Sequence, residues 1–362
     1  MLTSQTVFDQ SAIASSSSPS LPKGRPVLSL PAYAKINLFL HIIGRRPDDY
    51  HDLQTVFRLL NWGDTLHFWQ GDLIPVQSSL GASQSPSALT FVKLMAAEHI
   101  TSNIADNLIV KAAQALLDYL YVTNNQHSPS LPTALSQVSI TVDKLIPMGA
   151  GLGGGSSNAA TTLLALNQLW QLQLNQSQLL DIAATIGADV PIFIWGKDAI
   201  GEGIGEQLTS IELPPQRYLL LFPNAHINTA QIFASPNLLR SCSLIDHQRV
   251  IDEQQQYLFD LQPPYQNVFE PIVSRLSLDI RQALDYLNYV STEITTLFSI
   301  SPSLTPKPRL TGSGSTVFLP LPTLDNGLYF ETHQLLSDLL PLWMDHAPCP
   351  AQVVTSLCSI ID

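Results

Sequence analysis

The sequence predicts an α+β protein of two domains. Its 362 residues exceed the usual size of a single hydrophobic core. Segments in which apolar and polar residues alternate, as they do in strands, are interspersed with segments of helical spacing. A glycine-rich run, PMGAGLGGGSS at 147–157, stands between one such strand and one such helix.

Residues 1–27 differ in composition from the rest of the chain. Four consecutive serines at 15–18 are followed closely by Pro19, Pro22 and Pro26. A segment of this kind does not bury enough apolar surface to order itself, which predicts a disordered tail. Because it is rich in serine and poor in acids, it also fits a fragment of an organelle-targeting peptide. Asp9 and the scarcity of arginine favour the tail.

The folded part is predicted to begin near Leu28 with a strand. Its apolar residues share one parity, which is typical of a half-buried strand: Leu30, Ala32, Ala34, Ile36 and Leu38. Residues 71–103 are rich in serine and predict a long loop or an insertion. Helical spacing returns at 106–120, and alternation at 138–143 predicts a strand that leads into the glycine run.

The second half of the chain again predicts both kinds of element. A largely buried helix is expected over 159–170, and another over 177–186 with Ser177 as its cap. Residues 218–222 predict a buried strand, and 316–319 predict a strand after a second glycine turn at 311–314. The polar stretch 236–264 predicts poor order or an elaborated surface. We divide the chain into the tail 1–27, an N-terminal domain 28–205 and a C-terminal domain 206–362.

The glycine run predicts a phosphate-binding loop. Glycine accepts positive φ and lets backbone N–H groups approach a ligand, and a helix that follows adds its unpaired first-turn N–H groups. The run lacks the Lys-Ser/Thr ending of a Walker loop, and no acidic residue stands where a dinucleotide fold requires one. The predicted ATP contacts are Pro147, Met148, Gly149, Ala150, Gly151, Leu152, Gly153, Gly154, Gly155, Ser156 and Ser157.

Charge and cysteine content limit the partners. A net charge of -12 argues against binding nucleic acid through its phosphates. The sequence has no run of eighteen or more apolar residues, so we expect no helix that spans a membrane and no membrane partner. Cys242, Cys349 and Cys358 are scattered, which indicates a reducing compartment and gives neither a zinc site nor a disulfide framework.

Three separated motifs resemble one kinase superfamily. They are AYAKINLFLHIIGRRPDDYHDLQTVF at 32–57, the glycine run, and LTGSGSTVF at 310–318. Their order and spacing are similar to those of the galactokinase, homoserine kinase, mevalonate kinase and phosphomevalonate kinase (GHMP) superfamily. Within it the chain resembles the family of 4-diphosphocytidyl-2-C-methyl-D-erythritol kinases. The resemblance implies a two-domain GHMP kinase fold, with an N-terminal ATP-loop domain, a C-terminal ferredoxin-like α/β sandwich and an active site in the cleft between them.

The same resemblance implies a reaction and its catalytic residues. The γ-phosphoryl group of ATP would pass to the 2-hydroxyl of a cytidine diphosphate-linked methylerythritol, a step of non-mevalonate isoprenoid biosynthesis. Lys35 matches the family's catalytic lysine, and Asp189 matches its catalytic aspartate. The carboxylate would accept the hydroxyl proton, while the ammonium would hold the geometry and offset developing charge.

Substrate contacts are also implied by the resemblance. Tyr50, His51 and Phe233 match positions that contact the cytidine base, and Asn37 and Thr229 match polar substrate contacts. Three positions depart from the family pattern. Asp49 replaces a common glycine, Ala230 replaces a frequent proline, and Val268 interrupts the usual Asn-Asp-Leu-Glu run.

ATP implies Mg²⁺, which binds mainly phosphate oxygens and water. Ser157 is either a hydroxyl ligand or a helix cap, and we assign no metal ligand. Two alternatives remain: another GHMP kinase of the homoserine or mevalonate type, and a catalytically silent nucleotide-binding regulator. We expect a monomer or weak homodimer, in a bacterial cytosol rather than a plastid stroma.

Overall fold

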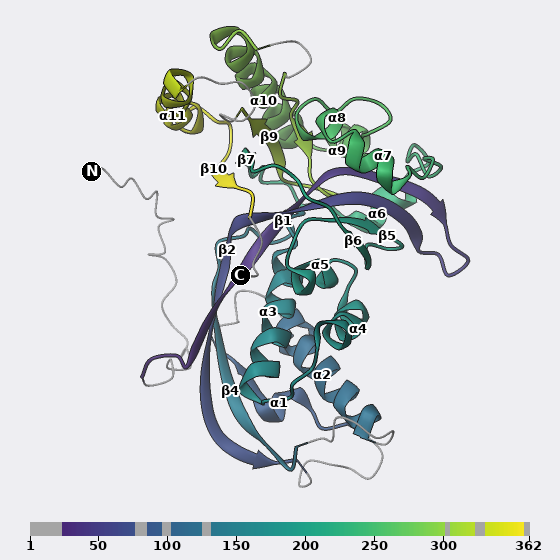
Figure 1. The fold of residues 1–362 in the computed structure, drawn as a ribbon, viewed down its shortest axis with the longest axis vertical. Coiled ribbons are helices and arrows are strands. Elements are labelled where there is room, and N and C mark those ends of the chain that lie inside the picture. Colours follow the sequence, from purple (N-terminus) through teal and green to yellow (C-terminus); the bar gives the residue numbers. More distant parts are fainter. Residues whose placement is uncertain are drawn as a thin grey trace.

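The computed structural model describes residues 24–76, 85–95, 103–124, 132–300, 305–322 and 330–357. Residues 1–23, which make up most of the predicted tail, lie outside these ranges. In the described residues the strands form two sheets, which lie in the lower and the upper part of Figure 1. The strands are β1 (Leu28–Arg45), β2 (His51–Pro75), β3 (Val92–Leu94), β4 (Ala134–Asp143), β5 (Ala199–Glu202), β6 (Gln207–Ser210), β7 (Arg217–Leu221), β8 (Arg309–Leu310), β9 (Val317–Leu321) and β10 (Ala351–Thr355).

The first sheet is built around the long antiparallel hairpin of β1 and β2. Its strand order is β3-β4-β2-β5-β6, with β1 also paired to β2. Helices α2, α3, α4 and α5 lie together on one face of this sheet, where α3 packs on β1 and β2 (Figure 1). The helices of this half are α1 (Ala88–Phe91), the 3₁₀ turn η3 (Ile104–Asp106), α2 (Leu108–Asn124), α3 (Gly154–Leu169), α4 (Gln176–Ile186) and α5 (Val190–Trp195).

The second sheet has the strand order β10-β7-β9-β8, with every neighbouring pair antiparallel. Helices connect β7 to β8, and α11 connects β9 to β10, so the chain follows the β-α-β-β-α-β path of a ferredoxin-like sandwich. This confirms the architecture expected for the C-terminal half. Its helices are α6 (Thr229–Ala234), α7 (His247–Asp252), α8 (Gln255–Leu258), α9 (Glu270–Leu276), α10 (Leu278–Leu297) and α11 (Phe330–Asp345).

Strand β1 contributes to all three hydrophobic clusters found in the described part of the chain. Ala32 lies in the cluster between the first sheet and its helices. Leu40 and Ile42 lie in the cluster between the second sheet and its helices. Phe39 lies in a third cluster that joins the two sheets. The two halves of the molecule therefore share one continuous strand.

Most predicted elements are confirmed, with two corrections. Residues 71–103 are not one long loop, because β2 extends to Pro75 and β3 pairs in parallel with β4 within this stretch. The stretch 236–264 is not poorly ordered, because it forms α7 and α8 and buries Val250 and Tyr257; the other expectation for it, an elaborated surface, stays a prediction. These elements are short, three residues in β3 and four in α8, so they carry too little pattern to stand out from the polar residues around them. The boundary at 205/206 stays a prediction; β5 and β6 lie on either side of it.

Candidate active site

The glycine run forms the turn between β4 and α3. Gly149, Gly151 and Gly153 all have positive φ, at 69°, 77° and 73°. Helix α3 begins at Gly154, with Gly153 as its N-cap, two residues before the serines expected to start it. The first-turn N–H groups of α3 are therefore presented beside the turn, where they favour an anion.

The second glycine turn packs directly against the first. A Cβ on Gly151 would lie 2.7 Å from the carbonyl oxygen of Thr311 and 2.8 Å from that of Gly314. The N–H of Thr316 donates to the carbonyl of Ala150 at 3.1 Å. Only glycine fits at position 151, because a side chain there would collide with backbone atoms.

A pocket of about 340 Å³ lies along the glycine run. Of the eleven predicted ATP contacts, Pro147 to Ser156 line it, whereas Ser157 does not. The opposite wall comes from the start of α2, with Lys144 and Asn158 completing the lining. Among the residues that the structure describes, the buried side-chain oxygen of Asn158 has no hydrogen-bond partner. The size suits a nucleotide-sized ligand.

Lys35 and Asp189 lie together beside the glycine run. The Lys35 ammonium nitrogen is 3.1 Å from a carboxylate oxygen of Asp189, and Lys35 is almost fully buried, whereas Asp189 is 37% exposed. The backbone N–H of Lys35 donates to the carbonyl of Leu152 at 3.0 Å, which fixes β1 to the turn. Asp189 precedes α5 without capping it through its side chain, so its carboxylate is available to the lysine.

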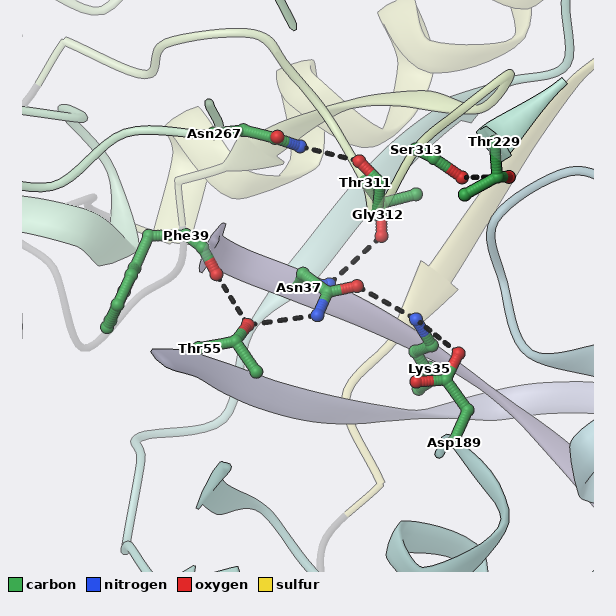
Figure 2. Close-up of polar contacts among 10 residues, drawn as sticks. All are labelled: Lys35, Asn37, Phe39, Thr55, Asp189, Thr229, Asn267, Thr311, Gly312 and Ser313. Atoms are coloured by element: carbon green, nitrogen blue, oxygen red, sulfur yellow. Dashed lines mark hydrogen bonds and ion pairs between the residues drawn. The ribbon is translucent and has the colours of Figure 1, made fainter. Parts of the chain in front are cut away.

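Asn37 lies at the centre of a hydrogen-bond network (Figure 2). Its side-chain oxygen accepts from the Lys35 ammonium at 2.8 Å, and its amide nitrogen donates to the hydroxyl of Thr55 at 2.9 Å. Its backbone N–H donates to the hydroxyl of Thr311 at 2.9 Å. Asn37 is 2% exposed, so its side chain orients Lys35 in this structure. A direct substrate contact by Asn37 stays a prediction.

His51, at the start of β2, and Phe233, in α6, form a stacked pair. Their ring centroids are 4.9 Å apart and their planes differ by 28°. Phe269 meets Phe233 edge-on at 5.1 Å. Burial, then the positive charges of Arg240 and Arg45, lower the pKa of His51, which favours the neutral ring. The buried Nε2 of His51 has no hydrogen-bond partner among the described residues.

Tyr50 lies at the tip of the β1–β2 hairpin, apart from this stack. Its side chain is 61% exposed, and within the described ranges no ring contact joins it to His51 or Phe233. The preceding Asp49 has a φ of 68°, the left-handed conformation that the family's glycine would adopt. Aspartate tolerates this region better than most residues, so the turn keeps its form despite the substitution.

Thr229 begins α6 and faces the second glycine turn. Its hydroxyl lies 3.1 Å from that of Ser313 (Figure 2). The sequence interpretation did not identify Lys144, Asn158 or Thr311 as site residues. Thr311 could have been found, because it lies inside the third motif, whereas Lys144 and Asn158 carry no signal of their own.

The geometry bears on metal binding as well. In the described ranges no group of three or more His, Cys, Asp or Glu side chains could hold an ion. Ser157 is buried and lies outside the pocket lining, which disfavours it as a hydroxyl ligand, and the helix cap is Gly153 rather than Ser157. None of the helices that the structure describes has the length and apolar composition needed to cross a bilayer.

Sequence relatives are kinases. A family model for the N-terminal domain of GHMP kinases matches residues 107–197. A 4-diphosphocytidyl-2-C-methyl-D-erythritol kinase of Psychrobacter cryohalolentis is 48% identical over 329 residues, which cover 90% of this chain and 95% of the relative. A protein of the same name from Burkholderia cenocepacia is 40% identical over 290 residues, which cover 79% of this chain and 83% of the relative.

Solved structures of two kinases have folds similar to that of this chain. A crystal structure of 4-(cytidine 5'-diphospho)-2C-methyl-D-erythritol kinase has a TM-score of 0.58 and 26% identity, and the match covers 91% of this chain and 99% of that one. Mevalonate kinase of Methanococcus jannaschii has a TM-score of 0.52 at 13% identity, with 93% and 100% coverage, which supports the fold alone. The likenesses confirm the GHMP kinase fold that the three motifs predict.

Proposed function

Because the chain belongs to the 4-diphosphocytidyl-2-C-methyl-D-erythritol kinase family, we propose that it phosphorylates the 2-hydroxyl of that cytidylyl alcohol with ATP. It is an ATP-dependent small-molecule kinase. The observation that carries the proposal is the Lys35–Asp189 pair at 3.1 Å, held beside a glycine turn that opens into α3. The product is the 2-phosphate, which places the reaction in the non-mevalonate route to isoprenoid precursors.

The proposed roles follow from the chemistry of phosphoryl transfer. The substrate hydroxyl oxygen attacks the γ-phosphorus, the bond to the β–γ bridging oxygen breaks, and ADP leaves. Asp189 accepts the hydroxyl proton because its carboxylate is partly exposed and lies beside the Lys35 ammonium. The Lys35 ammonium offsets charge that develops on the transferring group.

ATP is proposed to occupy the pocket along the glycine run. Its phosphates would meet the N–H groups of the turn and of the first turn of α3. The base and ribose would lie toward the start of α2, where Asn158 and Lys144 also line the pocket. Mg²⁺ would arrive with ATP, held chiefly by phosphate oxygens and water, and would supply charge neutralisation for the phosphates.

The cytidine base is proposed to bind near the stacked pair of His51 and Phe233. Aromatic faces stack on a base, and the neutral imidazole offers a hydrogen-bonding nitrogen to its Watson–Crick edge. Tyr50 at the hairpin tip would cover the base from outside. Thr229 would contact the polar part of the substrate, next to Ser313.

One assay tests this proposal and separates it from its rivals. Product formation with ATP is measured for the cytidylyl alcohol, homoserine and mevalonate in parallel. We expect turnover of the cytidylyl alcohol alone. Preference for homoserine or mevalonate would favour another GHMP activity, and ATP binding without turnover of any alcohol would favour a silent regulator. The bacterial origin of the relatives supports a bacterial cytosol as the setting, and a monomer or weak homodimer stays our expectation.

A further inference from the structure

Both polar atoms of the Asn267 side chain form hydrogen bonds within the protein. Asn267 lies between α8 and α9 and is 4% exposed. Its amide nitrogen donates to the carbonyls of Leu310 and Gly312, both at 2.9 Å, and its oxygen accepts from the N–H of Phe269 at 3.0 Å. Two carbonyls of the second glycine turn are therefore held by one amide group.

Glu270 holds the same turn from the other side. Its carboxylate accepts from the backbone N–H of Leu310 at 2.7 Å. Both backbone groups of Leu310 are thus bonded by side chains from a single segment, 267–270. The intervening Val268 points no polar group at the turn; it is buried in the second core, and its N–H donates to the carbonyl of Leu40 on β1. We call the bonds from Asn267 and Glu270 to Leu310 and Gly312 the clamp. The departure from the family pattern at Val268 therefore leaves the clamp intact.

Besides the direct bond from the Lys35 N–H to Leu152, the second glycine turn provides another link between the proposed catalytic groups and the ATP loop. The Thr311 hydroxyl accepts the N–H of Asn37, whose side chain orients the Lys35 ammonium (Figure 2). On its other side the turn packs against Gly151, with no room for a Cβ between them. A shift of the turn would displace the strand that bears Lys35 relative to the glycine run.

We propose that Asn267 and Glu270 are positioning residues for phosphoryl transfer. They set the second glycine turn, and the turn sets the register between Lys35 and the bound triphosphate; this inference rests on the proposed function. Neither residue lines the nucleotide pocket, so their effect falls on alignment and not on ATP binding. Rates of this kind of reaction are sensitive to small errors in position.

The test is the isosteric variant Asn267→Asp. A carboxylate has the shape of the amide but donates nothing to the two carbonyls, so we expect kcat to fall by about 10-fold or more while the ATP dissociation constant changes by less than about threefold. Burial and the two facing carbonyls raise the pKa of the new carboxyl, so lowering the pH from 8.5 to 6 increases the fraction that is protonated and can donate to one carbonyl. The kcat of the variant relative to wild type is expected to rise across that range.

Glu270→Gln is the matched control, because its side-chain oxygen still accepts the N–H of Leu310. We expect its kcat to stay within about threefold of wild type, whereas the kcat of Glu270→Leu is expected to fall about as much as that of Asn267→Asp. Assays at a temperature well below the midpoint of thermal unfolding separate alignment from unfolding. A kcat for folded Asn267→Asp within twofold of wild type, or one that only tracks the folded fraction, would overturn the proposal.

Amide hydrogen exchange provides a readout without substrate. The N–H of Asn37 donates to Thr311 at the second glycine turn, and the N–H of Thr316, just after that turn, donates to Ala150 of the glycine run, so both are expected to exchange faster in Asn267→Asp than in wild type. Unchanged exchange at both positions contradicts the clamp. Wild-type protein that fails to phosphorylate the cytidylyl alcohol contradicts the proposed function instead, and the exchange measurement still decides the clamp.

Discussion

The ammonium of Lys35 is buried and lies 3.1 Å from the carboxylate of Asp189, which is partly exposed. The inner member of the pair is fixed by Asn37, and the outer member faces the side from which a substrate could approach. The pair is therefore asymmetric: the lysine is held in place, and the aspartate is accessible.

The first prediction concerns Asp189→Asn. An amide does not accept a proton from the substrate hydroxyl, so kcat is expected to fall by about 100-fold or more while ATP affinity is retained. Turnover and nucleotide binding are measured separately. Asp181→Asn, on the exposed face of α4, serves as the control and should behave as wild type. Near-normal turnover in Asp189→Asn would remove the proposed role as base.

Gly151 and Gly149 provide a matched pair for the glycine turn. Both have positive φ, but a Cβ at Gly151 would lie 2.7 Å from a backbone oxygen, whereas one at Gly149 meets open space. Gly149→Ala is therefore expected to cost only the strain of a left-handed alanine, about 1–2 kcal/mol. Gly151→Ala is expected to cost the same strain and, in addition, to push the two glycine turns apart. We therefore expect its kcat/KM for ATP to be about 10-fold lower than that of Gly149→Ala. Equal effects of the two variants would argue against the packing described.

Loss of an aromatic ring should affect the cytidylyl substrate and not ATP. Stacking on a base is worth about 1–3 kcal/mol, which corresponds to a rise in substrate KM of about 5- to 150-fold. We expect Phe233→Ala and Tyr50→Ala to show such rises, with the KM for ATP little changed. Tyr289→Ala, an exposed aromatic on α10, is the control. A larger change in the ATP constant would remove the affected residue from the cytidine site.

His41 makes stability depend on pH. Burial lowers its pKa to about 4, and the carbonyl of Pro264 opposes the shift only in part. Above pH 6.5 the ring is neutral in both states and contributes nothing. As the pH falls below 6.5, the unfolded state takes up a proton that the folded state refuses, so the free energy of unfolding decreases. At pH 5 this loss is about 2 kcal/mol.

The measurement is urea unfolding at pH 7.5 and pH 5.0 for wild type and His41→Leu. Leucine fills the buried site without titrating, so the drop in unfolding free energy between the two pH values should be smaller in the variant by about 2 kcal/mol. An identical drop in both proteins would show that His41 is not the group responsible.

The sequence predicted the regular elements well where periodicity was clean. The alternation in β1 and β4 and the apolar spacing of α3 all correspond to real elements. The short strand β3 was missed because three residues carry too little pattern, and α4 begins one residue earlier than expected, with Asn175 as its cap instead of Ser177. Such ends are decided by local hydrogen bonds that periodicity does not reveal.

Only the site residues that match a recognisable sequence motif were predicted. Lys35 and Asp189 came from resemblance, since a single lysine or aspartate has no distinguishing pattern. The clamp at Asn267 was beyond reach, because its partners are carbonyl groups at Leu310 and Gly312, which any residue supplies. Contacts between a side chain and distant backbone leave no trace in the residue types of one partner.

The course of β1 through all three clusters constrains how the polypeptide can be dissected. A fragment that starts at residue 206 would lack Leu40 and Ile42, and its own hydrophobic interior would be left open to water. It would also lose the backbone bonds between Leu40 and the segment 266–268. The two halves of the structure therefore cannot be separated by a single cut in the chain, because the hydrophobic core of each contains residues of the β1–β2 hairpin.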